Sequence, residues 1–119
     1  MPTLTNPRPI SPTGEANNRM RLRALCGIPQ HHRITITQGI MAYPAEQQEE
    51  IIHRILVFQA FTEDNDPHLD RDLMVIEYLG TKIYGKMDHY DLAMEYLSPD
   101  TSNDQLTTRV LTIMLADEY

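Results

Sequence analysis

The spacing of hydrophobic residues changes from one segment of this chain to the next, and this change constrains the fold more than any other feature. Residues 33–37 alternate between polar side chains and isoleucine, a pattern typical of a strand with one buried face. Residues 44–61 instead space their apolar residues three and four positions apart, which predicts a helix with one apolar face. That face carries Ile51, Ile52, Ile55 and Leu56.

A β-hairpin is predicted near the middle of the chain. Residues 73–79 and 82–87 both favour strand structure, and they flank Gly80-Thr81, where a glycine suits a tight turn. Alternate residues of a strand point to opposite faces, so one face of the first strand is expected to be buried. The buried face is expected to carry Met74, Ile76 and Tyr78.

Two further helices complete the predicted fold. The first covers residues 15–26 and is ended by Gly27, and the last begins at about Ser102. The apolar face expected for the last helix carries Leu106, Val110, Ile113 and Met114. Residues 88–98 fit either a continued strand or a short helical turn. The predicted fold class is α+β, with a small antiparallel sheet (one strand plus a β-hairpin) packed against two or three helices.

The first fourteen residues are expected to form a proline-rich leader. Residues 1–14 hold four of the eight prolines, and proline removes a backbone donor and restricts its predecessor. We therefore predict a leader without regular structure at 1–14, followed by a single α+β domain at 15–119.

The composition indicates a cytoplasmic protein. No apolar run approaches the roughly 20 residues that span a bilayer, and the N-terminus lacks the apolar segment of a secretory signal. The chain has one cysteine, Cys26, which excludes an internal disulfide and a cysteine-rich zinc site.

The net charge of −7 divides into two unlike parts. Residues 1–33 hold five arginines against Glu15 alone, a net +4, whereas residues 34–119 hold 5 basic and 16 acidic side chains, a net −11. An acidic body does not favour general binding to nucleic-acid phosphates, but it suits a basic protein surface. Direct nucleic-acid binding through the N-terminal arginines is the weaker alternative.

Acidic residues are most concentrated in the predicted loop over residues 62–72. This loop has no hydrophobic periodicity, and two more aspartates follow near the end of the predicted hairpin. Carboxylates on a rigid surface can bind a basic groove and accelerate association by electrostatic steering. The predicted partner-binding residues are Glu63, Asp64, Asp66, Asp70, Asp72, Asp88 and Asp91.

A metal site built from histidine and aspartate is a second possibility. Imidazole and carboxylate suit iron, zinc or manganese, provided that the fold brings the two histidine-containing segments together. The candidate ligands are His68, Asp70, His89 and Asp91. A calcium loop is not supported, because the required glycine and the bidentate glutamate are replaced by Leu69 and Val75.

Other enzyme chemistry finds little support in the sequence. No G-x-S-x-G nucleophile motif occurs, and Cys26 lies at a predicted helix C-terminus, where the helix dipole disfavours a thiolate. Five glycines do not form a phosphate-binding loop or a dinucleotide fingerprint. We therefore assign no catalytic residue and no cofactor.

Four motifs resemble a small family of unknown function. They are Phe61-Thr62-Glu63-Asp64-Asn65-Asp66-Pro67, Lys86-Met87-Asp88-His89-Tyr90-Asp91, Ser98-Pro99-Asp100 and the ending Arg109-Val110-Leu111-Thr112-Ile113-Met114-Leu115-Ala116-Asp117-Glu118-Tyr119. The resemblance covers roughly residues 19–119. The family occurs mainly in alphaproteobacteria, often on plasmids, phages and integrated elements.

The resemblance implies a mobile-element setting and assigns no catalytic residues. In that setting, a small acidic protein is expected to inhibit or modulate a host nucleic-acid-handling system, in the manner of anti-CRISPR or anti-restriction proteins, by protein–protein contact. Two alternatives are a dimeric structural or regulatory subunit, with Ile113 and Met114 of the predicted last helix in its interface, and a small metal-dependent hydrolase.

Overall fold

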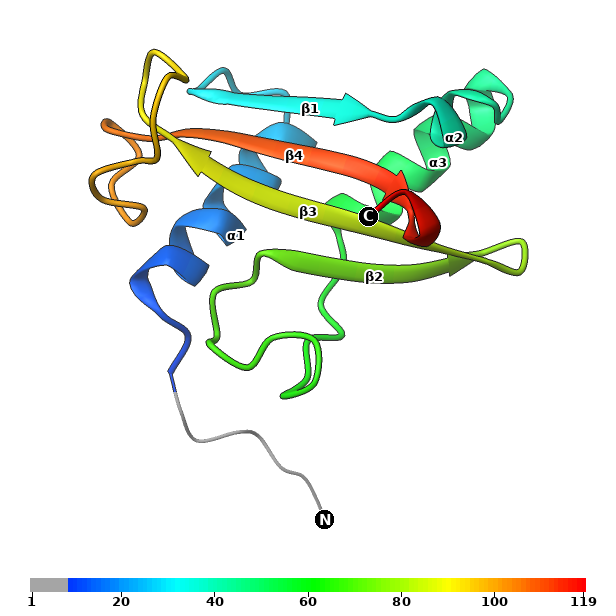
Figure 1. Cartoon of the computed structure of the whole chain (residues 1–119), viewed down its shortest axis with the longest axis horizontal. Helices are drawn as coiled ribbons and strands as arrows, with labels where there is room; N and C mark the ends of the chain where they lie inside the picture. The colour runs from blue at the N-terminus through cyan, green and yellow to red at the C-terminus, as the bar shows by residue number, and fades with distance from the viewer. Residues whose placement is uncertain (1–8) are drawn as a thin grey trace.

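Four strands form one sheet, in which a hairpin of two adjacent strands is joined by two strands from distant parts of the chain. The computed structural model describes residues 9–119. Their spatial order is β1 (His32–Ile36), β4 (Thr108–Leu115), β3 (Thr81–Tyr90) and β2 (Leu73–Tyr78) (Figure 1). The remaining elements are α1 (Pro12–Leu25), α2 (Gln38–Met41), α3 (Ala45–Leu56) and the short 3-10 helix η1 (Ala116–Glu118). The α+β fold class is confirmed.

The sheet is mixed, whereas the sequence predicted an antiparallel one. β2 and β3 form the predicted antiparallel hairpin, and β3 also pairs antiparallel with β4. β1 runs parallel to β4, with Ile34 opposite Leu111 and Ile36 opposite Ile113. β4 is therefore a central strand, held by ladders on both sides.

The predicted last helix is wrong, because its main segment is β4. Val110, Ile113 and Met114 fit helical spacing, but the β-branched residues of this segment also favour a strand. Short apolar runs are ambiguous by periodicity alone, and here pairing with β1 and β3 decides the outcome. Residues 101–106 form turns rather than the start of a helix.

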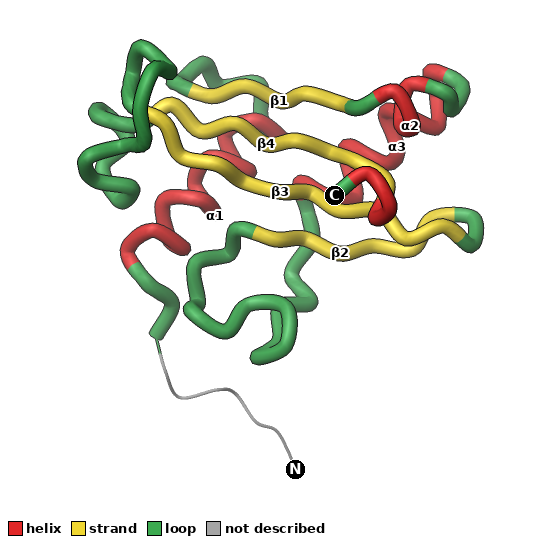
Figure 2. Tube along the Cα trace, viewed as in Figure 1, coloured by secondary structure: helices red, strands yellow, loops and turns green. Residues whose placement is uncertain are grey.

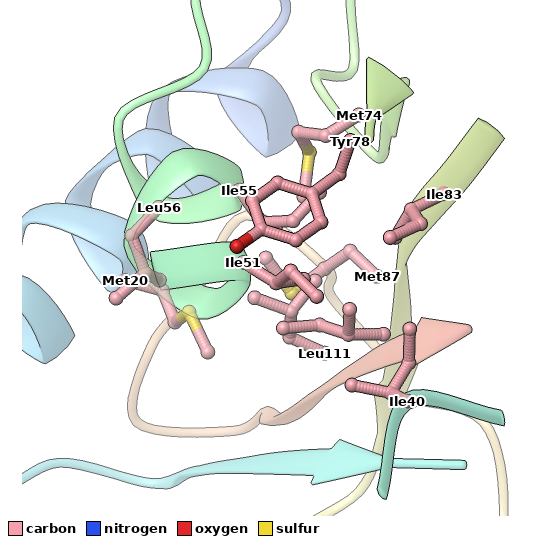
Figure 3. Close-up of a cluster of buried hydrophobic side chains, with 11 residues drawn as sticks. Met20, Ile40, Ile51, Ile55, Leu56, Met74, Tyr78, Ile83, Met87 and Leu111 are labelled. Carbon is pink, nitrogen blue, oxygen red and sulfur yellow. The ribbon is translucent and has the colours of Figure 1, made fainter. Parts of the chain in front are cut away.

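Both long helices cover the same face of the sheet, and the core lies between them and the strands. In Figures 1 and 2, α1 and α3 lie behind the sheet while η1 lies in front of it. Figure 3 shows helix side chains meeting strand side chains in this core. The fully buried members of the core include Met20, Ile51, Ile55, Met74, Ile83, Leu111 and Ile113. The predicted burial is confirmed for Ile51, Ile55 and Leu56 of α3 and for Met74 and Tyr78 of β2. Ile52 and Ile76, predicted on the same faces, are only partly buried and pack against the core.

Gly85 allows α3 to approach β3 closely. A Cβ atom added at Gly85 would lie 2.6 Å from Cγ2 of Ile55 and 3.3 Å from Cε of Met74. The missing side chain therefore makes room for the helix that covers the sheet. This explains a glycine in the middle of a strand without any ligand.

Element boundaries follow local chemistry. α1 begins at Pro12, three residues before the predicted start, since the hydroxyl of Ser11 accepts a hydrogen bond from the Gly14 amide and caps the helix. Most of the predicted leader, residues 1–8, lies outside the described residues. The hairpin turns at Leu79 and Gly80, both with positive φ. α3 ends at Leu56, five residues before its predicted end.

A helix both long enough and apolar enough to span a bilayer is not found among residues 9–119.

Candidate interaction surface

The loop that joins β3 to β4 exposes large apolar side chains at one end of the sheet. We call residues 91–107 the β3–β4 loop. Within it Tyr96 is 73% exposed and Leu97 is 78% exposed, and Leu92 and Met94 are 48% and 37% exposed. Leu106 adds a further exposed side chain near the end of the loop. A cluster of exposed apolar residues within one loop is typical of a surface that contacts another protein.

The backbone of this loop is firmly held. The Asp91 amide donates to the Tyr96 carbonyl (2.8 Å), and the Ser98 amide donates to the His89 carbonyl (3.1 Å). The carboxylate of Asp91 also accepts hydrogen bonds from the amides of Glu95 (3.0 Å) and Tyr96. The apolar side chains are thus presented by an ordered turn, which reduces the entropy lost when a partner binds.

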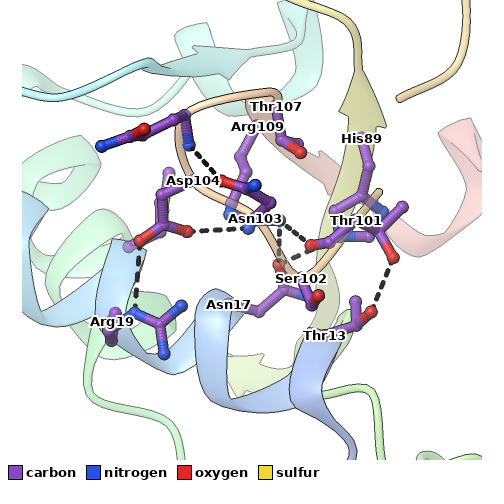
Figure 4. A network of polar contacts seen from close by, with 12 residues as sticks. Thr13, Asn17, Arg19, His89, Thr101, Ser102, Asn103, Asp104, Thr107 and Arg109 are labelled. Carbon is purple, nitrogen blue, oxygen red and sulfur yellow. Dashed lines mark hydrogen bonds and ion pairs between the residues drawn. The ribbon is translucent and has the colours of Figure 1, made fainter. Parts of the chain in front are cut away.

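A buried arginine anchors the second half of the loop to the sheet. Arg109 of β4 is only 2% exposed, and it donates to the Thr101 carbonyl (2.9 Å) and to the carboxylate of Asp104 (2.9 Å). Figure 4 shows Arg109 beneath the loop, between Asp104 and Thr101. Since these contacts fix two points of an otherwise irregular segment, Arg109 acts as the internal support of the β3–β4 loop.

Asp104 joins this support to the first helix. Its carboxylate also pairs with Arg19 (3.2 Å) and Arg23 (3.0 Å) on α1. Burial opposes ionisation of Asp104, but hydrogen bonds from Arg109 and Arg19 outweigh it, and the net effect lowers the pKa. These contacts occupy two of the N-terminal arginines that the nucleic-acid alternative requires.

Asn17 of α1 connects the same network to β3. Its Oδ1 accepts from Arg109 Nη1 (3.3 Å) and lies 3.0 Å from His89 Nε2, while its Nδ2 donates to the Asp70 carbonyl (2.8 Å). Burial, and to a smaller extent the charge of Arg109, lowers the pKa of His89 to about 4, against the opposing effects of Asp88 and Asp70. His89 is therefore neutral near pH 7.

The β3–β4 loop is acidic as well as apolar. It contains four acidic residues and no lysine, arginine or histidine. Asp104 is neutralised by arginines and Asp91 caps the turn, whereas Glu95 is exposed beside Tyr96. An apolar tip with negative neighbours complements a basic surface that has an apolar depression.

The seven predicted partner-binding residues differ in their exposure to solvent. Glu63 and Asp64 are exposed in the loop over residues 62–72, as a contact surface requires. Asp66 is buried instead: its carboxylate pairs with the guanidinium of Arg71 and accepts the Arg71 amide (2.9 Å). Asp66 therefore shapes the loop and is not available to a partner.

The other four residues are only partly exposed. Asp70 accepts a hydrogen bond from the Ser11 hydroxyl, and burial together with the charge of Asp70 raises the pKa of Asp72. Asp88 pairs with Lys86 (3.2 Å) on the sheet face that α1 and α3 leave open, and Asp91 belongs to the β3–β4 loop. In Figure 1 the loop over residues 62–72 lies below the sheet, at a distance from the β3–β4 loop, so the predicted set is not one continuous surface.

The candidate metal ligands are also divided. Asp70 and His89 are linked through Asn17, but His68 is exposed and Asp91 caps a turn. Among residues 9–119, no group of three or more histidine, cysteine, aspartate or glutamate side chains is arranged to hold a metal ion.

The interface predicted for the dimer alternative, with Ile113 and Met114 on a last helix, is not present in the described structure. Ile113 is fully buried in the core, and Met114 is 8% exposed on the open face of the sheet. A strand with both neighbours paired offers no helical face for a second copy.

The exposed apolar residues of the β3–β4 loop are not among the partner-binding residues predicted from the sequence. The apolar residues of this loop fit both a helical and a strand period, because Leu92, Met94 and Tyr96 alternate as in a strand while Leu92 and Tyr96 are also one helical turn apart, and the sequence alone therefore leaves residues 88–98 undecided. The available signal was four large apolar residues in six positions, between the turn-forming Asp91 and Pro99.

Comparison with protein families matches residues 36–118 to a family described as protein of unknown function (DUF3768). The matched range includes β2, β3, β4, α2, α3 and the whole β3–β4 loop, and it takes in only Ile36 of β1. Comparisons with curated proteins and with solved structures found no match. The chain therefore belongs to the DUF3768 family, whose function is unknown.

Proposed function

We propose that this protein is a non-enzymatic binding protein that docks its β3–β4 loop onto a basic surface of another protein. The observation that carries the proposal is the exposure of Leu92, Met94, Tyr96 and Leu97 on a loop whose backbone is held by several hydrogen bonds. Each such side chain contributes about 1.5–3 kcal/mol when it is fully removed from water. Aromatic and methionine side chains are enriched at the centres of protein interfaces.

The proposed partner is a protein that handles nucleic acid. Glu95 within the loop and the net charge of −11 over residues 34–119 favour a partner with a basic binding groove. The family resemblance, with its plasmid and phage setting, directs the search to host defence and regulatory systems of the CRISPR or restriction type. In this proposal the protein occupies the groove and competes with nucleic acid.

Site-specific photocrosslinking in the native host tests the docking surface. Tyr96 is replaced with p-benzoylphenylalanine in the full chain, and the exposed His53 on α3 is replaced in the matched control. We expect the Tyr96 probe to yield one protein adduct that the His53 probe does not. Adding Leu92→Ser and Leu97→Ser to the probe variant should abolish the adduct.

The purified partner then tests the electrostatic part of the proposal. Glu95→Lys should weaken binding about tenfold at low salt and less at high salt, whereas Glu49→Lys on the outer side of α3 should leave it unchanged. Excess nucleic acid should compete with the protein for the partner. Three results would contradict the proposal. They are equal adducts at both probe positions, an affinity for the partner that Glu95→Lys does not change, and an adduct with a second copy of the chain.

A further inference from the structure

A cavity of about 460 Å³ lies between α1 and the residues that follow α3, away from the β3–β4 loop. Leu22, Leu25, Val57 and Phe58 line its apolar side, and Arg21 and Arg71 contribute two guanidinium groups. Small-molecule sites commonly occupy 300–1,000 Å³ and combine apolar walls with a few polar groups. The cavity has the size and the composition of such a site.

Arg21 is buried without a carboxylate partner. It is 5% exposed, and its Nη1 donates to three backbone carbonyls at the C-terminal end of α3, at Ile55 (3.2 Å), Leu56 (3.3 Å) and Phe58 (2.6 Å). Its Nη2 donates to Asn18 (2.9 Å). Nη1 thus caps the end of α3 and Nη2 contacts α1, but Nε has no hydrogen-bond partner among the described residues.

Arg71 brings a second positive charge to the same place. The guanidinium carbons of Arg71 and Arg21 lie 4.6 Å and 5.3 Å from the centroid of the Phe61 ring. Burial, together with the smaller effect of the charge of Arg71, lowers the pKa of Arg21 to about 10. Asp66 pairs with Arg71 alone, so this cluster of two arginines and one aspartate keeps a net positive charge.

The apolar side of the cavity is open to solvent. Leu22 is 61% exposed, and Leu25 and Val57 are each about 40% exposed. Leucine and valine side chains exposed to water are unfavourable. A buried guanidinium nitrogen without a hydrogen-bond partner is also unfavourable. One molecule that has both an anionic group and an apolar body would satisfy both features.

We infer that this cavity binds a small organic carboxylate with an apolar body. The carboxylate would lie against Arg21 and Arg71, and the body would cover Leu22, Leu25 and Val57. Charge-assisted hydrogen bonds from guanidinium to carboxylate are the strong polar contacts available here. This inference is independent of the proposed function, because the β3–β4 loop contributes no residue to the cavity.

Nuclear magnetic resonance titration of the full, ¹⁵N-labelled chain tests the inference with 4-phenylbutyrate as the probe. We expect shifts at the backbone amides of Leu22, Leu25 and Val57 and at the Nε–H of Arg21. The matched neutral compound, 4-phenylbutanamide, should bind at least about tenfold more weakly, because it has no carboxylate to form charge-assisted hydrogen bonds with the guanidinium groups.

Two variants locate the site. Arg71→Gln should reduce the affinity for 4-phenylbutyrate to that for the neutral amide, with the amide spectrum reporting whether the variant remains folded. Leu25→Trp should block both compounds by filling the cavity from its exposed side, whereas Met41→Trp, at an exposed position on α2, should block neither. Equal affinity for the two compounds, shifts confined to other surfaces, or no shift at millimolar 4-phenylbutyrate would overturn the inference.

Discussion

The side-chain oxygen of Asn17 lies 3.0 Å from Nε2 of His89, across 72 positions of sequence. An amide oxygen only accepts hydrogen bonds, and this one also accepts from Arg109, so His89 is the donor and carries its proton on Nε2. One fully buried amide therefore connects α1 to β3 and β4 beneath the β3–β4 loop. Both the free energy of unfolding and the position of the β3–β4 loop on the sheet should depend on this contact.

Asn17→Ala is expected to destabilise the protein by about 2–3 kcal/mol, because it leaves buried donors of His89 and Arg109 without their acceptor. Urea unfolding followed by circular dichroism measures the change. The control is Gln105→Ala, at an exposed position, which should change the free energy of unfolding by less than about 0.5 kcal/mol. Similar losses in the two variants would show that the network contributes little.

Stability should fall as the pH decreases from about 6.5 to about 4, partly because of His89. The pKa of His89 is about 4 in the folded protein, against an ordinary value near 6.5, so the unfolded chain binds the proton first. The contribution of His89 to the free energy of unfolding is fully present above pH 6.5 and is lost as the pH falls toward 4. After allowance for partial exposure, the loss is about 2 kcal/mol.

His89→Gln is the test of that assignment. Glutamine retains a donor toward Asn17 but does not titrate, so the pH dependence of unfolding should become flatter between pH 6.5 and 4. Burial also lowers the pKa of His32, which leaves a smaller dependence of the same sign in the variant. Identical pH profiles for the two proteins would exclude His89 as the source.

Asp66→Asn and Asp64→Asn should behave differently, although the two residues are neighbours in the acidic loop. Asp66 is buried against Arg71, so its neutralisation should cost about 2–4 kcal/mol and leave the arginine unpaired. Asp64 is exposed, and its substitution should change stability by less than about 0.5 kcal/mol. Thermal unfolding of both variants measures this. Equal losses of stability in the two variants would mean that the buried ion pair of Asp66 does not stabilise the fold.

Gly85→Ala should destabilise the fold by about 1–3 kcal/mol, because the new methyl group meets Ile55 at 2.6 Å. A double-mutant cycle with Ile55→Ala checks the cause. If the two side chains compete for one space, the double variant should lose less stability than the two single variants added together. Simple additivity would place the strain elsewhere.

Tyr96→Ser together with Leu97→Ser should leave the free energy of unfolding within about 0.5 kcal/mol of the parent, since both side chains are mostly exposed. Chemical denaturation measures the change. A large loss of stability would show that these residues pack within the fold and are not displayed for a partner.

The sequence alone predicted the elements whose signals are local. The alternation in residues 33–37, the apolar stripe of α3 and the glycine of the hairpin each depend on residues a few positions apart, and all three are observed. The general α+β class followed from these elements. The acidic character of residues 34–119 is likewise a property of composition, which no tertiary contact can change.

Tertiary structure decided whether residues 108–115 form a helix or a strand, and it decided which acidic residues remain on the surface. The segment over residues 108–115 suits a helix or a strand, and only the ladders with β1 and β3 select the strand. Asp64 and Asp66 are equivalent in sequence pattern, but the backbone and side chain of Arg71 bury the second one. Hydrophobic periodicity reports one face of one element, whereas burial depends on segments that lie far apart in the chain and meet only after folding.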